Sequence, residues 1–196
     1  LSHYYERHAR PLQAHTMGRI GMWAPLAARV PNLVNGLIGW PLVSRAMKRA
    51  AGIAPQRSLP RIAPKSFRAQ FEALHRAQRI PGRSGGVRRG DPVLLFPDTF
   101  TNYFRPHAAI AAARVIEASG ARVYLPQERL CCGRPYFDFG MLDQAKASLA
   151  KILAALDPQI ESGVPIVVLE PGCHSVFRDE LGKLFPGNPN AAKLAG

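Results

Sequence analysis

The strongest constraint on the fold is an alternation of short apolar runs and helix-like segments in the second half of the chain. Apolar runs occupy residues 93–96, 122–126 and 164–169, and segments with helical signals lie at 106–119, 141–162 and 175–185. This order is typical of parallel strands joined by right-handed helical crossovers. The sequence therefore predicts an α/β fold, a small three-stranded parallel, Rossmann-like half-domain preceded by a basic helical and proline-rich extension.

All three cysteines of the chain follow predicted strands. Cys131 and Cys132 are adjacent and come after the second apolar run, whereas Cys173 follows the third. We expect both sites to lie on loops at the carboxyl ends of the strands, where open α/β sheets assemble ligand sites.

Several roles are open for these cysteines on spacing alone. Neighbouring side chains on an extended backbone point to opposite sides, so two adjacent thiolates reach different irons of one cluster more easily than they clamp one ion. Free cysteines are also often buried simply as small apolar groups. Zinc bound by Cys131, Cys132, Cys173 and His174 is a further alternative, although the usual spacing of zinc ligands is absent. A disulfide between neighbours would form a strained ring.

The first ninety residues differ sharply in charge from the remainder. They carry sixteen Lys or Arg side chains against two acidic ones, a net charge of +14, whereas residues 91–196 carry ten basic and eleven acidic side chains. We divide the chain into a leader at 1–90, with basic helices, a proline-rich strap and a linker, and an α/β half-domain at 91–196. An anionic-surface or nucleic-acid binding module is the alternative function that this charge raises, but no known nucleic-acid binding fold accompanies it.

Prolines and glycines divide the leader itself. Prolines break residues 1–52 into short helices that Gly52 ends, and three prolines at 53–64 favour an extended strap. Ser66 is placed to cap a helix over residues 67–78, and residues 81–86 read as a linker that marks the domain boundary.

Targeting signals are weak. The apolar run at 20–47 contains Arg29 and several prolines, which makes it a poor membrane span, and the start has no apolar signal core. Leu1 in place of Met, and the lack of a clear structural end over 190–196, lead us to expect a piece of a longer polypeptide. The expected location is the cytoplasm, with peripheral association at the inner face of the membrane as an alternative.

The motifs at the strand ends resemble a known family. Residues 95–103, then Cys131-Cys132-Gly133-Arg134-Pro135, then residues 169–173 and 177–181 resemble the cysteine-rich CCG domain. That domain occurs in iron-sulfur subunits of glycolate oxidase and anaerobic glycerol-3-phosphate dehydrogenase, and in one subunit of heterodisulfide reductase. The likeness covers residues 93–185 and is greatest to fused enzymes that join FAD-binding, ferredoxin-like and CCG regions, described as D-lactate or D-2-hydroxyglutarate dehydrogenases.

Two departures from the family pattern affect the ligand set. An earlier family cysteine is replaced here by Thr99, preceded by Asp98, so the chain supplies three thiolates. Asp98 is then a candidate oxygen ligand. The family also carries two CCG units, and a second one does not occur in these residues, so a cluster that needs both halves would be incomplete.

The resemblance implies an iron-sulfur electron-transfer region, of the 4Fe-4S type, in an FAD-dependent oxidoreductase for a 2-hydroxyacid such as lactate, glycolate or 2-hydroxyglutarate. This region would have no catalytic residues of its own, and FAD would lie in a separate domain. Cys131, Cys132 and Cys173 would be metal ligands, with Asp98 and His174 as additional candidates. The implied partners are FAD-binding and ferredoxin-like domains or subunits, the second CCG half and an acceptor such as a quinone; nucleic acid is not expected.

Other residues of the motifs would surround the cofactor. Gly133 would let the backbone approach closely, and Arg134, followed by Pro135, would offset thiolate charge. Asn102 and Tyr103 would lie in the next layer, although loop and helix capping explains them equally well. A zinc-bound fragment, or a structural one with buried cysteines, is the remaining alternative.

Overall fold

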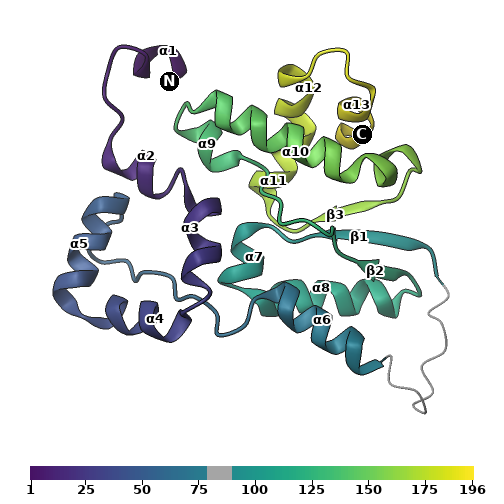
Figure 1. The fold of residues 1–196 in the computed structure, drawn as a ribbon, viewed down its shortest axis with the longest axis horizontal. Coiled ribbons are helices and arrows are strands. Elements are labelled where there is room, and N and C mark those ends of the chain that lie inside the picture. The colour runs from purple at the N-terminus through teal and green to yellow at the C-terminus, as the bar shows by residue number, and fades with distance from the viewer. Residues whose placement is uncertain (79–89) are drawn as a thin grey trace.

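The computed structural model describes residues 1–78 and 90–196 (Figure 1). The predicted linker at 81–86, and with it the evidence for a domain boundary there, lies outside the described residues. The division at residue 90 stays a prediction.

A three-stranded parallel sheet forms the centre of the second half. Strand β1 (Pro92–Phe96) lies between β2 (Arg122–Tyr124) and β3 (Ile166–Val168), in the order β2-β1-β3. Leu94 is paired with Tyr124 on one side and with Ile166 on the other. The predicted fold class is therefore confirmed.

Two of the strands are shorter than the apolar runs that predicted them. Proline has no N–H to donate to a neighbouring strand. Pro126 follows β2 at a short distance, and Pro165, which precedes β3, contributes its carbonyl oxygen to the amide of Leu94 at 2.9 Å.

Helices cover both faces of the sheet, because side chains along β1 alternate between them. Leu95 packs with α6 (Phe67–Gln78) and α8 (Pro106–Ala118). Leu94 and Phe96 pack on the opposite face, in a core that includes the long helix α10 (Leu142–Glu161). The remaining helical elements on this face are η1, a π-helix at Val176–Glu180, α12 (Leu181–Leu184) and α13 (Pro189–Ala195).

The leader folds into short helices, as its prolines predict. They are α1 (Ser2–Tyr5), α2 (Leu12–Thr16), α3 (Ile20–Ala27), α4 (Pro31–Gly39) and α5 (Pro41–Ala51). Proline opens α4 and α5, and Gly52, with a φ of 66°, ends α5. Figure 1 shows α4 and α5 away from the sheet, whereas α3 lies beside α7 (Thr99–Tyr103).

The proline-rich strap connects these helices to α6 without a helix or strand of its own. Ile62 is only 2% exposed and exchanges two hydrogen bonds with the Asn35 side chain, while the Ala63 amide donates to the Tyr103 carbonyl at 2.8 Å. The strap is therefore fastened to both the leader and α7.

Short helices at the strand ends were not predicted. Besides α7, these are α9 (Arg134–Asp138) and α11 (Pro171–Ser175). The expectation that Cys173 lies on a loop is wrong, because the helix already begins at Pro171. Proline is pre-set for a first helical turn, and the Glu170 carboxylate accepts from the Gly172 amide at 3.5 Å.

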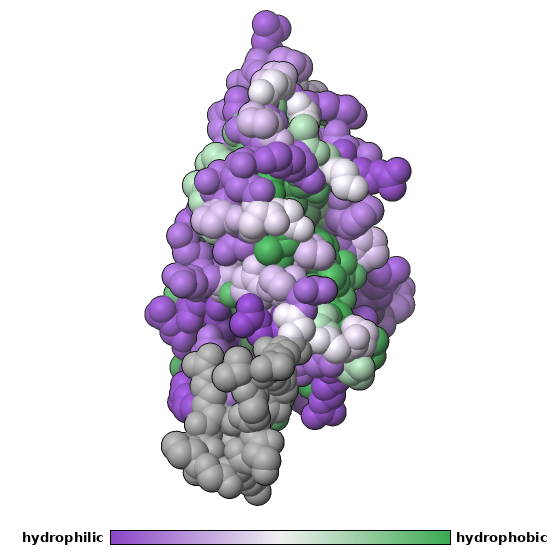
Figure 2. Space-filling model, turned by 90° about the vertical axis from the view of Figure 1, so that its right-hand side faces the viewer, coloured by the Kyte–Doolittle hydropathy of each residue, from purple (hydrophilic) through white to green (hydrophobic). Residues whose placement is uncertain are grey.

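The surface is mixed in character. Figure 2 views the side on which β1 begins and shows mainly hydrophilic residues around a band of hydrophobic ones. No helix in the described ranges is long and apolar enough to span a bilayer.

We expect Phe67→Ala to lower the free energy of unfolding by about 3–5 kcal/mol, the usual cost of deleting a buried aromatic ring. Phe67 is fully buried and packs with residues of β1, β2 and α8. Urea denaturation would measure the change. Leu42→Ala, at a side chain that is 79% exposed, is the control and should change stability by less than about 0.5 kcal/mol. Equal effects of the two substitutions would contradict the packing of α6 on the sheet.

Candidate functional site

The candidate site lies at the carboxyl edge of the sheet. Parallel strands end on the same side, so the segments that follow β1, β2 and β3 meet there. These segments are α7, the loop at 125–133 and α11 (Figure 1). Leu130 and Cys132 belong to the core beneath α10, which anchors the loop.

The structure brings the three cysteines together as free thiols. Cys131 is hydrogen-bonded to Cys132, which in turn is hydrogen-bonded to Cys173. Cys132 and Cys173 are 3% and 5% exposed, whereas Cys131 is half-buried. The thiols thus form a row that joins two strand ends.

These surroundings favour the protonated thiols. The hydrogen bond to Cys132, burial and the charge of Cys132 raise the pKa of Cys131. The hydrogen bond with Cys131 lowers the pKa of Cys132, but the hydrogen bond with Cys173, burial and the charge of Cys173 outweigh it and raise that pKa. Three crowded, buried thiolates therefore need a cation or a cluster to neutralise them.

The donor set fits a cluster in kind more closely than it fits a single ion. Thiolates are the usual ligands of iron-sulfur clusters, and three of them adjoin here. However, no three His, Cys, Asp or Glu side chains converge on one metal position within the described residues. This geometry gives no support to zinc held by Cys131, Cys132, Cys173 and His174, and His174 is exposed on α11.

Thr99 lies directly against the cysteine row. Its hydroxyl donates to Cys131 Sγ, with 3.8 Å between the oxygen and the sulfur. Gly21 of α3 closes the other side, since a Cβ at this position would lie 2.9 Å from the same sulfur. The leader therefore forms part of the wall around Cys131.

Asp98 is used within its own helix. Its carboxylate caps α7, accepting from the amides of Phe100 at 2.8 Å and Thr101 at 2.9 Å and from the Thr101 hydroxyl. The side chain is 1% exposed. These bonds engage both carboxylate oxygens and explain the buried charge without a metal.

Asn102 and Tyr103 are buried between the leader and the sheet. Asn102 Oδ1 accepts from the Arg68 amide at 3.1 Å, which joins α7 to the start of α6. Tyr103 packs with Ile20 and Ala24 of α3. Both residues lie in the layer next to the cysteines, as predicted, and both also serve packing.

Gly133 permits a close backbone approach, but its neighbour is α10. Its φ is 78°, and a Cβ would lie 3.1 Å from the Ala145 carbonyl oxygen. The glycine thus seats the cysteine loop on the long helix.

Arg134 connects the two cysteine segments. Its guanidinium pairs with Asp138 at 2.8 Å and with Glu180 at 3.0 Å, and it donates to the Ser175 hydroxyl at 3.1 Å. Pro135 opens the helix that carries it. The described contacts of Arg134 are with oxygen atoms, so it holds the Cys131–Cys132 loop against the helix of Cys173.

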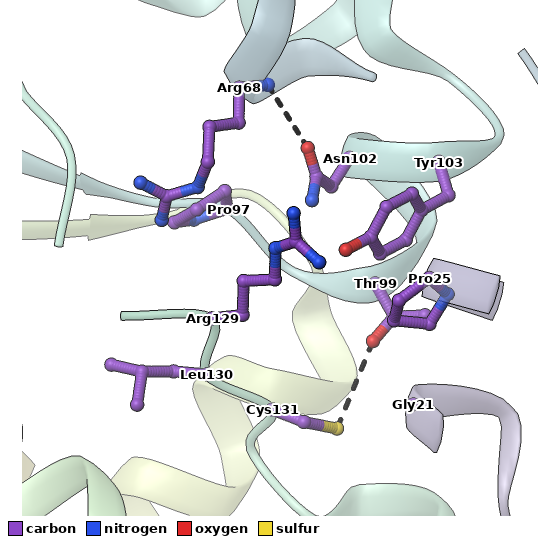
Figure 3. Close-up of a pocket in the computed structure, with 10 residues that line it drawn as sticks. All are labelled: Gly21, Pro25, Arg68, Pro97, Thr99, Asn102, Tyr103, Arg129, Leu130 and Cys131. Carbon is purple, nitrogen blue, oxygen red and sulfur yellow. Dashed lines mark hydrogen bonds between the residues drawn. The ribbon is translucent and has the colours of Figure 1, made fainter. Parts of the chain in front are cut away.

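A pocket of about 50 Å³ opens beside Cys131 (Figure 3). Sequence reasoning missed four of its residues, Gly21, Pro25, Arg68 and Arg129. Burial lowers the pKa of Arg68, as does Arg129, while Glu72 and Tyr103 raise it. Three of the missed residues belong to the leader, and only Arg129, two positions before Cys131, carried a signal in its place in the sequence.

The chain is similar to several dehydrogenase proteins. It is 26% identical over 185 residues to D-2-hydroxyglutarate dehydrogenase of Escherichia coli K12, which covers 92% of this chain and 18% of that protein. It is 25% identical over 149 residues to one subunit of the anaerobic glycerol-3-phosphate dehydrogenase of the same strain (76% and 36%). Lactate utilization protein A of Bacillus velezensis is 29% identical over 103 residues (53% and 41%).

The resemblance seen in the sequence is confirmed as a distant similarity over most of the chain. The chain spans about a fifth of the length of the D-2-hydroxyglutarate dehydrogenases it matches. No protein-family model matches it, and no solved structure does. Assignment to the CCG domain stays a prediction.

We expect Gly133→Ala to destabilise the protein more than Gly163→Ala. Both glycines have positive φ angles, 78° and 68°, so both substitutions carry a backbone penalty of about 1 kcal/mol. Only Gly133 has neighbours within 4 Å of the added methyl group, and overlap with α10 should add about 1–3 kcal/mol. Thermal and urea unfolding of the two variants would measure the difference; equal losses would show that the close approach to α10 is unimportant.

Proposed function

We propose that this chain is an iron-sulfur electron-transfer region of an FAD-linked 2-hydroxyacid oxidoreductase. The observation that carries the proposal is the row of three thiols at the carboxyl edge of a parallel sheet. Similarity to D-2-hydroxyglutarate dehydrogenase over 92% of the chain supports the same class. Cys131, Cys132 and Cys173 are the proposed ligands.

The bound cluster would supply one-electron carriage between a flavin and an acceptor. The residues of this chain would hold and tune it. Thr99 donates a hydrogen bond to Cys131 Sγ, which stabilises negative charge on that sulfur. Arg134 fixes the spacing between the two cysteine segments through Ser175 and Glu180.

The proposed context is a larger electron-transfer system. Its other parts would be an FAD-binding and a ferredoxin-like domain or subunit, a second CCG half that completes the ligand set, and an acceptor such as a quinone. The similarity to one subunit of a dehydrogenase and to a much longer dehydrogenase supports both arrangements, as separate subunits and as a fused chain.

We expect Cys132→Ser to lower the iron and sulfide bound after anaerobic reconstitution at least several-fold. Cys132 is the central thiol of the row, and a serine hydroxyl is a poor ligand for cluster iron. Iron and sulfide analysis, visible absorption and EPR would measure the loss. Val176→Ala is the matched control, because Val176 is 1% exposed, lies three residues from Cys173 and carries no sulfur. Unchanged iron and sulfide in Cys132→Ser would refute the ligand role, and stoichiometric zinc in the purified wild type would favour a zinc protein.

Thr99→Cys should increase iron and sulfide retention relative to the wild type. Its side-chain oxygen lies 3.8 Å from Cys131 Sγ, so a thiol at this position would extend the row to four sulfurs. Thr99→Ser is the control, since it keeps the hydroxyl and adds no sulfur. The same measurements apply, and retention no higher than in Thr99→Ser would argue against a cluster at this edge.

A further inference from the structure

The pocket beside Cys131 is rich in hydrogen-bond donors. Its walls come from α3, the start of α6, α7 and the loop before Cys131. Two arginines, Arg68 and Arg129, line it, and no acidic side chain does. The leader contributes Gly21 and Pro25, whose small or rigid side chains leave the space open.

The orientation of Asn102 is fixed by its partner. A backbone N–H can only donate, so the atom that receives the Arg68 amide at 3.1 Å must be the side-chain oxygen. The amide nitrogen therefore faces the other way. Figure 3 shows it directed toward the guanidinium of Arg129, beside the hydroxyl of Tyr103.

The two arginines lack a full set of acceptors. Arg68 is 15% exposed, and its Nε is buried without a hydrogen-bond partner. Its other contacts are the Glu128 carbonyl at 3.0 Å and Glu72 at 4.0 Å, a side chain that is 53% exposed. For Arg129, no side-chain hydrogen bond or ion pair occurs in the part of the chain that the structure describes.

The geometry points to a binding site for a small oxyanion, a carboxylate or a phosphate group, between Arg129, Asn102 and Tyr103, with Arg68 behind them. Such a group accepts hydrogen bonds from several directions and pairs well with the planar guanidinium. It would also offset the repulsion between the two arginine charges. A volume of about 50 Å³ suits one such group and is too small for a nucleotide or a flavin.

The position of this site gives it a relation to the cysteines. Cys131 and Thr99 line the same pocket, so a bound anion would lie in the same cavity as the outermost thiol of the row. The inference does not depend on iron binding, since the donors are arranged without a metal.

The test is a titration of the metal-free 196-residue chain with sodium phosphate in one series and sodium malonate in another, at constant ionic strength kept with chloride. NMR signals of the arginine Nε–H groups report binding. We expect saturable shifts of the Arg68 and Arg129 signals, and the anion with the lower Kd identifies the preferred source. Shifts that do not saturate with either anion would overturn the site.

Matched variants separate a built site from general charge. Arg129→Ala should weaken binding about ten-fold or more, because a charge-assisted contact is lost. Arg114→Ala, at an exposed arginine on α8, should leave Kd unchanged. Tyr103→Phe, which keeps the buried ring and deletes only the hydroxyl, should weaken binding several-fold and tests the site without removing charge. Equal Kd values for Arg129→Ala and the wild type, or equal losses in Arg129→Ala and Arg114→Ala, would refute the proposal.

Discussion

Parallel pairing of β1 with both of its neighbours is the constraint on which the candidate site depends. Because β2 and β3 run in the same direction as β1, all three chain segments that carry site residues leave the sheet at one edge. Residues more than thirty positions apart, such as Thr99 and Cys131, meet there. An antiparallel arrangement would send one of these segments to the opposite end of the sheet.

The sheet positions the segments, and polar contacts set their spacing. Arg134 joins the Cys131–Cys132 loop to Ser175 and Glu180, and Gly133 allows the same loop to rest on the backbone of α10. The capped helices α7 and α11 then fix Thr99 and Cys173. The site is thus supported from every side by residues whose own contacts are satisfied locally.

The fold class and the grouping of the cysteines could be predicted because each follows from local patterns. Continuous apolar runs predicted β1, β2 and β3, and cysteines placed after two of them were expected at a common edge. The short helices could not be predicted as easily, since five residues carry little periodicity and α11 depends on the cap at Glu170. The pocket was not predicted at all, because Gly21 and Arg68 reach Cys131 only through tertiary packing.

The contact between Gly21 and Cys131 has a consequence for how the leader and the sheet are coupled. With hydrogen as its side chain, residue 21 allows α3 to rest on the sulfur itself, so the basic helices act as a cover as well as a connector. Dioxygen and other oxidants would reach the half-buried thiol less readily while this cover is in place. The leader would therefore protect a redox-sensitive atom that lies more than a hundred residues away in the chain.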